Sequence, residues 1–429
     1  MSEVADQSGH GQDYEEVQFG PKTIILPSDW STVRFGDVFH RRKESIEADG
    51  EGVVRYVGLK HLDSGQLQIN GYEENGDERS SSRAFRTGDI LFGKLRPNLN
   101  KAAIAPFDGI CSSDIIPIYA EEETLQQYLP YLMHSKLIRD RVVSTMEGTN
   151  LPRTSWSDLE KTVVPLPPVS ERRYIADVLS VVDEQIEQTD EIIKRTLELK
   201  EGVHQDLFTS GFYEHDNVTT RKLITAPDEW EIRALSEFTK ESAYGPRFSS
   251  DQYQEDGNIA TLRTTDLTDD GGINYQTMPL AELDPDEFKD HFLQEGDFVI
   301  SRTGANCGIC TVWEGFDTPT VPGAYMIRFR LTDGLNPHYL RDYINSPIGS
   351  KNVDVLARGS SQKNLAGSDL LSMTIPVPPR DEQDKIVEAG SRINQQLREE
   401  RQTKETLEEL KEGLMQDLLT GKIRVNSED

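Results

Sequence analysis

The feature that most constrains this chain is an internal repeat. Residues 163–211 begin VVPLPPVSERRYIADVLSVVDEQI and end KEGVHQDLFTSG. A similar stretch follows at a constant offset of 211 residues, beginning TIPVPPRDEQDKIVEAGSRINQQL and ending KEGLMQDLLTGK. The identical positions include Pro165, Pro168, Glu171, Ile175, Gly202, Gln205, Asp206 and Thr209, which recur as Pro376, Pro379, Glu382, Ile386, Gly413, Gln416, Asp417 and Thr420. A register kept without interruption over such a length indicates duplication of one structural element.

Each copy is predicted to form one long helix. The Pro-Pro pair ends an extended segment and fixes a φ angle suited to a helix start, and a glutamate follows near the positive helix N-terminus. Apolar residues then recur mostly three and four positions apart, at Ile175, Leu179, Val182, Ile186, Ile193, Val203 and Leu207, and at Ile386, Ile393, Leu397, Leu407, Leu414 and Leu418. This spacing favours two helices packed together as a coiled coil; the alternative is that each packs on its own domain. About 38 residues at about 1.5 Å each give a rod of roughly 57 Å.

The segments before the two helices also correspond, although less closely. Trp30 matches Trp230, and Lys94 follows a buried-strand pattern that matches the one before Arg302. We therefore predict an α+β fold: two mixed α/β globules separated by two long antiparallel helices, with an internal pseudo-two-fold repeat. The expected divisions are a disordered acidic tail (1–20), a first globule (21–165), a first helix (166–212), a second globule (213–376), a second helix (377–424) and a short tail (425–429).

The net charge of −29 alone argues against binding to nucleic acid. The acidic residues are spread along the whole chain, however, and arginine outnumbers lysine. This pattern resembles adaptation to a salty cytoplasm, so we expect a halophilic protein; the alternative is an ordinary acidic one. No apolar run is long enough to span a membrane, and the N-terminus lacks an apolar signal segment, so we expect a cytoplasmic protein.

Taken together, the motifs identify the chain as similar to the specificity subunit of type I restriction–modification enzymes, over residues from about 21 to 424. The resemblance is carried by the PLPP-x-x-E-x-x-x-I start at Pro165, its PVPP counterpart at Pro376, the KEG-x-x-QDL-x-T ends and the repeated module. It implies two target-recognition domains, each reading one half of a bipartite, asymmetric site in double-stranded DNA. The chain departs from the family in its acidity and its long polar tail.

The resemblance also implies partners. Two copies of a DNA adenine methyltransferase (M) subunit, which brings S-adenosylmethionine, would dock on the helices, and a restriction/translocase (R) subunit, which uses ATP and Mg, would cut unmodified DNA. We expect this chain to bind none of these cofactors itself. The helix positions expected to dock partners are Glu171, Ile175, Gln205, Asp206, Glu382, Ile386, Gln416 and Asp417.

No catalytic or metal-binding set stands out in the sequence. Amino-methyltransferases need an Asn/Asp-Pro-Pro-aromatic motif, but in Asn336-Pro337-His338-Tyr339 a histidine replaces the second proline. We interpret Pro337 as the first residue of a helix. Cys307 and Cys310 form a lone CxxC pair, which is insufficient for a structural zinc site. The chain is therefore expected to be non-catalytic and metal-free.

DNA readout needs Arg, Lys, Asn, Gln, Ser or Thr side chains presented on loops. Basic and amide-rich clusters of this kind stand out in an acidic chain, although the resemblance does not supply their positions. The candidates are Lys94, Arg96, Asn98, Asn100, Lys101, Thr149, Asn150 and Arg153 in the first globule, and Tyr244, Arg247, Arg302, Asn306, Arg358, Ser360, Gln362, Lys363 and Asn364 in the second. Two other functions stay open: a coiled-coil scaffold with protein-binding globules, and a fused methylase–specificity chain.

Overall fold

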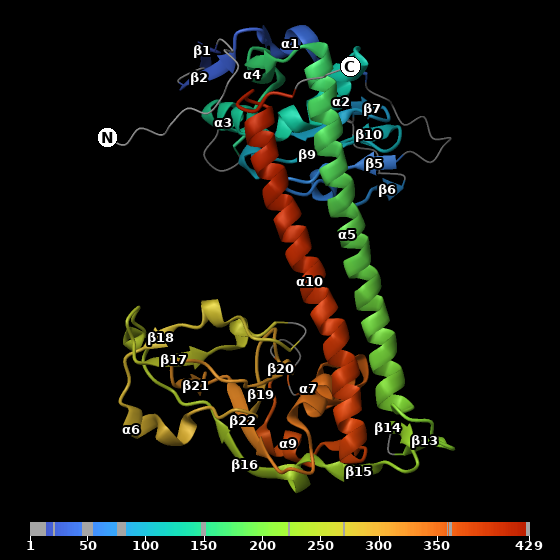
Figure 1. The fold of residues 1–429 in the computed structure, drawn as a ribbon, viewed down its shortest axis with the longest axis vertical. Helices are drawn as coiled ribbons and strands as arrows, with labels where there is room; N and C mark the ends of the chain where they lie inside the picture. Colours follow the sequence, from blue (N-terminus) through green and yellow to red (C-terminus); the bar gives the residue numbers. More distant parts are fainter. Residues whose placement is uncertain are drawn as a thin grey trace. The chain divides into compact units, whose positions relative to one another are not determined.

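The structure is a computed structural model that describes residues 14–19, 22–44, 55–74, 83–146, 152–221, 224–268, 271–357, 359 and 363–425. The chain divides into two compact units (Figure 1). Unit 1 comprises Met1–Gln188 and Thr403–Asp429, and unit 2 comprises Thr189–Gln402. Each unit therefore contains one globule and a part of each long helix.

The two long helices are α5, Val169–Thr209, with 41 residues, and α10, Arg380–Leu418, with 39 residues. Each begins directly after a Pro-Pro pair, as the sequence predicts. The first part of α5 and the last part of α10 belong to unit 1, whereas the last part of α5 and the first part of α10 belong to unit 2.

Unit 1 is a mixed α/β globule. Its helices are α1 (Phe35–Val38), α2 (Glu123–His134), α3 (Lys136–Ser144) and α4 (Trp156–Glu160). Its strands are β1 (Tyr14–Phe19), β2 (Lys22–Pro27), β3 (Ser31–Arg34), β4 (His40–Arg41), β5 (Arg55–Val57), β6 (Glu73–Glu74), β7 (Arg83–Phe85), β8 (Ile90–Gly93), β9 (Ala102–Ile104), β10 (Gly109–Cys111), β11 (Ile115–Tyr119) and β12 (Val163–Leu166). The larger sheets have the orders β6-β5-β10-β7 and β4-β11-β8-β9, and β3 pairs with β12.

Unit 2 has the same kind of organisation. Its helices are α6 (Pro285–Phe288), α7 (Pro337–Asn345), α8 (Pro347–Leu356) and α9 (Gly367–Ser372). Its strands are β13 (Val218–Arg221), β14 (Ile224–Pro227), β15 (Glu231–Ala234), β16 (Thr239–Tyr244), β17 (Ile259–Leu262), β18 (Leu280–Ala281), β19 (Phe298–Ser301), β20 (Cys310–Val312), β21 (Thr320–Pro322), β22 (Met326–Leu331) and β23 (Thr374–Val377). The larger sheets have the orders β16-β22-β19-β20 and β18-β17-β21, and β15 pairs with β23. The mixed helix-and-sheet prediction is confirmed, and the predicted strands at β8 and β19 are fully buried.

Both long helices contribute to the core of each unit. In unit 1, Ile175 and Leu179 of α5 and Leu418 of α10 join one buried cluster with the residues of the globule. In unit 2, Phe208 of α5 and Ile386 of α10 join the corresponding cluster. Each globule is thus completed by the helix that follows it and by the end of the other helix, so the apolar stripes do not serve helix–helix packing alone.

A buried carboxylate fixes the start of α5 in unit 1. Glu171 Oε2 accepts a hydrogen bond from the indole N–H of Trp30 at 2.8 Å. Arg424, which follows the end of α10, donates from Nε to Glu171 Oε1 at 2.9 Å and from Nη2 to Asp29 Oδ2 at 2.7 Å. A charge buried to this degree is stabilised only by such paired donors. The contact ties together the entry segment, the start of α5 and the residues after α10.

The start of α10 in unit 2 has an equivalent carboxylate with a different cation. Glu382 Oε2 accepts from the indole N–H of Trp230 at 3.0 Å, and Glu382 Oε1 accepts from the backbone N–H of Phe212 at 2.9 Å. The imidazole Nε2 of His215 lies 3.0 Å from Glu382 Oε1, and its Nδ1 lies 3.2 Å from Glu229 Oε2. A titratable histidine therefore stands where unit 1 uses an arginine.

The expectation of a disordered tail over residues 1–20 is wrong for residues 14–19. These residues form β1, which pairs antiparallel with β2 in a register that places Tyr14 opposite Pro27 and Val17 opposite Ile24. The reason is physical: the ladder satisfies the backbone groups, and Val17 packs against the core cluster of unit 1. The rest of that tail lies outside the described residues. Among the helices that the structure describes, none is both long and apolar enough to cross a membrane.

Candidate nucleic-acid interface

In unit 1, the loop that follows β8 is joined to the segment before α4. Lys94 accepts a backbone hydrogen bond from Thr154 N at 3.0 Å, and Arg96 N donates to Pro152 O at 2.8 Å. Leu95 and Arg153 form an isolated β-bridge. Two clusters that are far apart in the sequence thus lie side by side, which places the Lys94 and Arg153 side chains at one edge of the sheet.

The loop has an unusual backbone conformation. Arg96 and Asn100 have φ angles of 49° and 50°, the left-handed region, and they flank a 3₁₀ turn over Pro97–Leu99. Non-glycine residues seldom adopt this conformation, and it costs of order 1 kcal/mol or more per residue. The bonds to the neighbouring segment hold the turn in place. Arg96 and Asn98 are both exposed to solvent.

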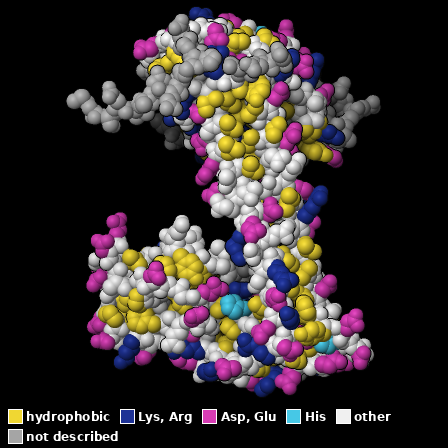
Figure 2. Space-filling model, viewed as in Figure 1, with side chains coloured by type: hydrophobic (Ala, Val, Ile, Leu, Met, Phe, Trp, Pro, Cys, Tyr) yellow, Lys and Arg dark blue, Asp and Glu magenta, His cyan; other side chains and the backbone are white. Residues whose placement is uncertain are grey.

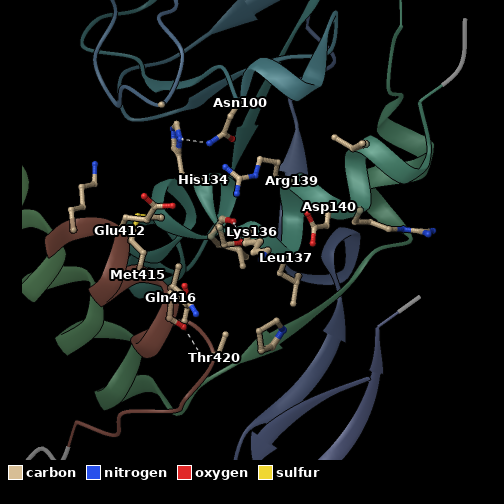
Figure 3. Close-up of a pocket in the computed structure, with 18 of the residues that line it drawn as sticks. Asn100, His134, Lys136, Leu137, Arg139, Asp140, Glu412, Met415, Gln416 and Thr420 are labelled. Atoms are coloured by element: carbon tan, nitrogen blue, oxygen red, sulfur yellow. Dashed lines mark hydrogen bonds between the residues drawn. The ribbon is translucent and has the colours of Figure 1, made fainter. Parts of the chain in front are cut away.

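Two of the predicted contact residues of this loop bond internally. Asn100 Nδ2 lies 3.2 Å from His134 Nδ1 (Figure 3). His134 Nε2 lies 2.6 Å from Ala102 O, and burial lowers the pKa of His134 to about 4, so the neutral ring donates from Nε2 and accepts at Nδ1. Lys101 Nζ donates to Leu59 O at 3.1 Å. Asn100 and Lys101 therefore position the loop.

Unit 2 repeats the arrangement at the end of β19. Leu365 N donates to Arg302 O at 2.8 Å, and Thr303 and Asn364 form an isolated β-bridge. The Arg302 guanidinium lies over the Tyr244 ring, 4.8 Å from its centroid, and donates from Nη2 to Asn364 Oδ1 at 3.3 Å. The structure thus brings Tyr244, Arg302 and Asn364 together from three separate segments.

The other candidates of unit 2 differ in their surroundings. Asn306 Nδ2 donates to Thr264 O at 2.7 Å, and Lys363 Nζ pairs with Asp354 Oδ1 at 2.6 Å on the surface. Arg247 is exposed. The Cys307 thiol donates to Arg302 O at 3.3 Å, which helps to shape the loop.

Several predicted contact residues lie outside the described residues: Thr149, Asn150, Arg358, Ser360 and Gln362.

The sequence-based prediction missed the residue that precedes β11 in unit 1. Asp114 Oδ1 lies 3.9 Å from Lys94 Nζ and 3.6 Å from Arg153 Nε. The carbonyl of Asp114 accepts from Lys94 N at 2.9 Å, as that of Tyr325 accepts from Arg302 N in unit 2 at the same distance. The pairing of Ile115 with Gly93 in unit 1 and of Met326 with Ser301 in unit 2 makes Asp114 and Tyr325 equivalent, and no local sequence pattern marks either of them.

Half of the expected docking positions need correction. Glu171, Ile175, Glu382 and Ile386 are at most 3% exposed, because they form the buried starts of α5 and α10. They serve internal packing, and the identity between the two copies reflects that shared role. Gln205, Asp206 and Gln416 are exposed, and Asp417 is half-buried beside Lys422.

The sequence motif at Asn336 has a structural role. Pro337 is the first residue of α7, as predicted, and the Asn336 side chain caps the helix by accepting from His338 N at 2.9 Å. Tyr339 is buried and donates from its hydroxyl to Pro376 O at 2.9 Å. Among the described residues, no group of three or more His, Cys, Asp or Glu side chains is arranged to hold a metal ion.

Charged residues of both signs are interspersed over each unit on the face drawn in Figure 2. The excess of acid is spread across the surface, so it does not forbid a local cationic edge like those at Lys94 and Arg302.

Comparison with known proteins agrees with this description. The family model for the type I restriction modification DNA specificity domain matches twice, at residues 27–198 and 227–409. The specificity subunit of the type I restriction enzyme MjaVIII from Methanocaldococcus jannaschii is 26% identical, over 97% of this chain and 98% of its own. The EcoDI specificity subunit of Escherichia coli is 31% identical over a shorter stretch, 37% of this chain and 36% of its own.

Two solved structures share the fold. A chain from a structure of a type I R-M system has a TM-score of 0.57 and 24% identity, covering 93% of this chain and 99% of its own. The S subunit of a type I restriction–modification system from M. genitalium also has a TM-score of 0.57, with 16% identity, covering 91% and 96%. Since the family model matches most of the chain, in two copies, the protein belongs to the type I restriction–modification DNA specificity family.

Proposed function

We propose that this chain is a non-catalytic specificity subunit that reads a bipartite, asymmetric site in double-stranded DNA, one half with each unit. The observation that carries the proposal is the equivalent loop in each unit, where a cation follows a buried strand and is bonded to a distant segment. We assign the DNA contacts to Lys94 with Arg153 and to Arg302 with Asn364, because lysine, arginine and asparagine are residue types that match base edges and phosphates.

The two loops differ in chemistry, and this supports different half-sites. Unit 1 presents Lys94, Arg153 and the exposed Arg96, whereas unit 2 presents Arg302 stacked on Tyr244 beside Asn364. Arginine and lysine suit guanine O6 and N7, and an asparagine amide suits adenine. One site read by two such unlike surfaces has unlike halves.

We also propose that α5 and α10 act as an antiparallel coiled-coil spacer between a first recognition domain (21–165) and a second (213–376). With 41 residues at about 1.5 Å each, α5 is about 60 Å long, which suits half-sites one to two turns of DNA apart. A pseudo-two-fold repeat would offer two equivalent helix faces to two M subunits. Gln205, Asp206, Gln416 and Asp417 are the repeated surface positions available for that contact.

The chemistry in this proposal is supplied by the partners. The M subunits would bring S-adenosylmethionine and methylate adenine, and an R subunit would bring ATP and Mg. The sharpest test is the methylome of a host that expresses this chain with its cognate M subunit, in which we expect adenine methylation at one bipartite, asymmetric motif.

Replacing residues 21–160 with those of a relative then tests the assignment of units to half-sites. One half of the motif should change while the other half and the gap stay the same. A change in both halves, or in neither, would contradict the assignment, and the absence of any motif with the unaltered chain would refute the proposed function.

A further inference from the structure

The carboxylate of Asp114 stands out because it lies within the cationic edge of unit 1. Its side chain is 25% exposed, and its Oδ1 atom lies 3.9 Å from Lys94 Nζ and 3.6 Å from Arg153 Nε. Both distances exceed that of a good charge-assisted hydrogen bond, which is about 2.7 to 2.9 Å. The Asp114 backbone is held firmly, since its N–H donates to Ser112 Oγ at 3.2 Å and its carbonyl accepts from Lys94 N.

A carboxylate in this position works against binding of the DNA backbone. It repels phosphate and partly neutralises the two cations beside it. The same position in unit 2 holds Tyr325, an uncharged residue that is 61% exposed. The acid is therefore a property of unit 1 alone and is not required by the fold at this strand end.

We infer, on the basis of the function proposed above, that Asp114 determines specificity. Its carboxylate accepts a hydrogen bond from the exocyclic amino group of a cytosine in the major groove. In that groove a C·G pair presents one donor, cytosine N4, next to the two acceptors of guanine, O6 and N7. A carboxylate is the usual acceptor for cytosine N4, and lysine and arginine are the usual donors to guanine O6 and N7, so Asp114 with Lys94 and Arg153 beside it suits one C·G pair. Phosphate offers only acceptors and is disfavoured.

The experiment compares the methylomes of hosts that express the cognate M subunit with the unaltered chain, with Asp114→Ala or with Asp114→Asn. Glu121→Gln is the matched control, because it removes one charge from an exposed residue past the other end of β11. With Asp114→Ala we expect one C·G position in one half of the motif to become degenerate, with discrimination falling roughly 5- to 150-fold. Asp114→Asn, which keeps an acceptor, should relax the same position less.

A second measurement separates readout from a structural role. The complex with Asp114→Ala should bind DNA that lacks the motif more tightly than the unaltered complex and with a steeper salt dependence, because the repulsion of phosphate is gone. The unchanged half of the motif reports that the protein is folded.

Each of the other outcomes would contradict the inference or the proposed function, and the methylome distinguishes them. A motif unaltered by Asp114→Ala, or relaxed at an A·T position, overturns it while leaving the proposed function intact. Loss of all methylation with the isosteric Asp114→Asn assigns the residue a structural role and also overturns it. Absence of a bipartite motif with the unaltered chain refutes the proposed function itself.

Discussion

At the start of each long helix a buried glutamate accepts hydrogen bonds from several donors. The basic side chain paired with this glutamate is Arg424 in unit 1 and His215 in unit 2. The hydrogen bond with Glu382 raises the pKa of His215 above its ordinary value of 6.5, and Glu229 acts in the same direction. Because the pKa is higher in the folded state, the stabilisation is complete below about pH 6.5 and is lost as the pH rises through the folded value.

We therefore expect the stability difference between the unaltered protein and His215→Gln to shrink as the pH is raised from about 5.5 to about 8.5. Urea unfolding at several pH values measures this difference and cancels the contribution of every other titrating group. A difference that stays constant over the range would show that the imidazolium is not stabilising.

The corresponding carboxylate in unit 1 gives a second prediction. Glu171→Ala removes the acceptor of the Trp30 indole and one of the two carboxylates that Arg424 bonds, leaving the buried indole N–H without its partner. We expect it to lower the free energy of unfolding of unit 1 by about 1 to 3 kcal/mol. Glu187→Ala, at an exposed position of the same helix, should change it by less than about 0.5 kcal/mol. Equal effects in chemical denaturation would contradict the role assigned to Glu171.

In helix α5, apolar residues that are close together in the sequence differ in how far they are buried. Leu179 is fully buried in the unit 1 core, whereas Val181, two positions on, is 56% exposed. We expect Leu179→Ala to destabilise unit 1 by about 2 to 5 kcal/mol, since it leaves a cavity. Val181→Ala should lie within about 0.5 kcal/mol of the unaltered protein. Denaturant midpoints of the two variants decide whether the stripe packs as described.

The sequence was sufficient for elements whose pattern is local. The Pro-Pro starts of α5 and α10, the buried strands β8 and β19 and the helix start at Pro337 all follow from periodicity and from the chemistry of proline. Features that depend on distant segments were not predictable. A hydrogen bond to Pro152 O holds Arg96 in its left-handed backbone conformation, and Asp114 lies near Arg153 only in the folded chain.

The internal repeat also led to one wrong prediction, that of a partner surface at the helix starts. Identity between Glu171 and Glu382 suggested a shared partner surface, yet the structure buries both residues. Positions repeated within one chain are kept alike equally well by a shared internal contact. Strand β1 was missed because its sequence is polar and its stability comes from a backbone ladder with β2.

For the whole molecule, the net charge of −29 governs how DNA affinity responds to salt. Salt weakens phosphate contacts by counterion release, but it also screens the repulsion between an acidic protein and DNA. We expect affinity for the recognised site to fall by much less than the roughly 10³-fold, between about 50 and 200 mM salt, that six or more phosphate contacts would give. Binding isotherms across that range test this, and a steep fall would contradict adaptation to high salt.

Unit 1 is built from two segments of the chain that are synthesised at different times. Its core needs Leu418, and its buried carboxylate needs Arg424, while unit 2 ends at Gln402. During translation, the ribosome therefore completes all of unit 2 before it adds the last residues of unit 1. The globule that is translated first is the one that finishes folding last, and until then its open core is a surface for chaperones to cover.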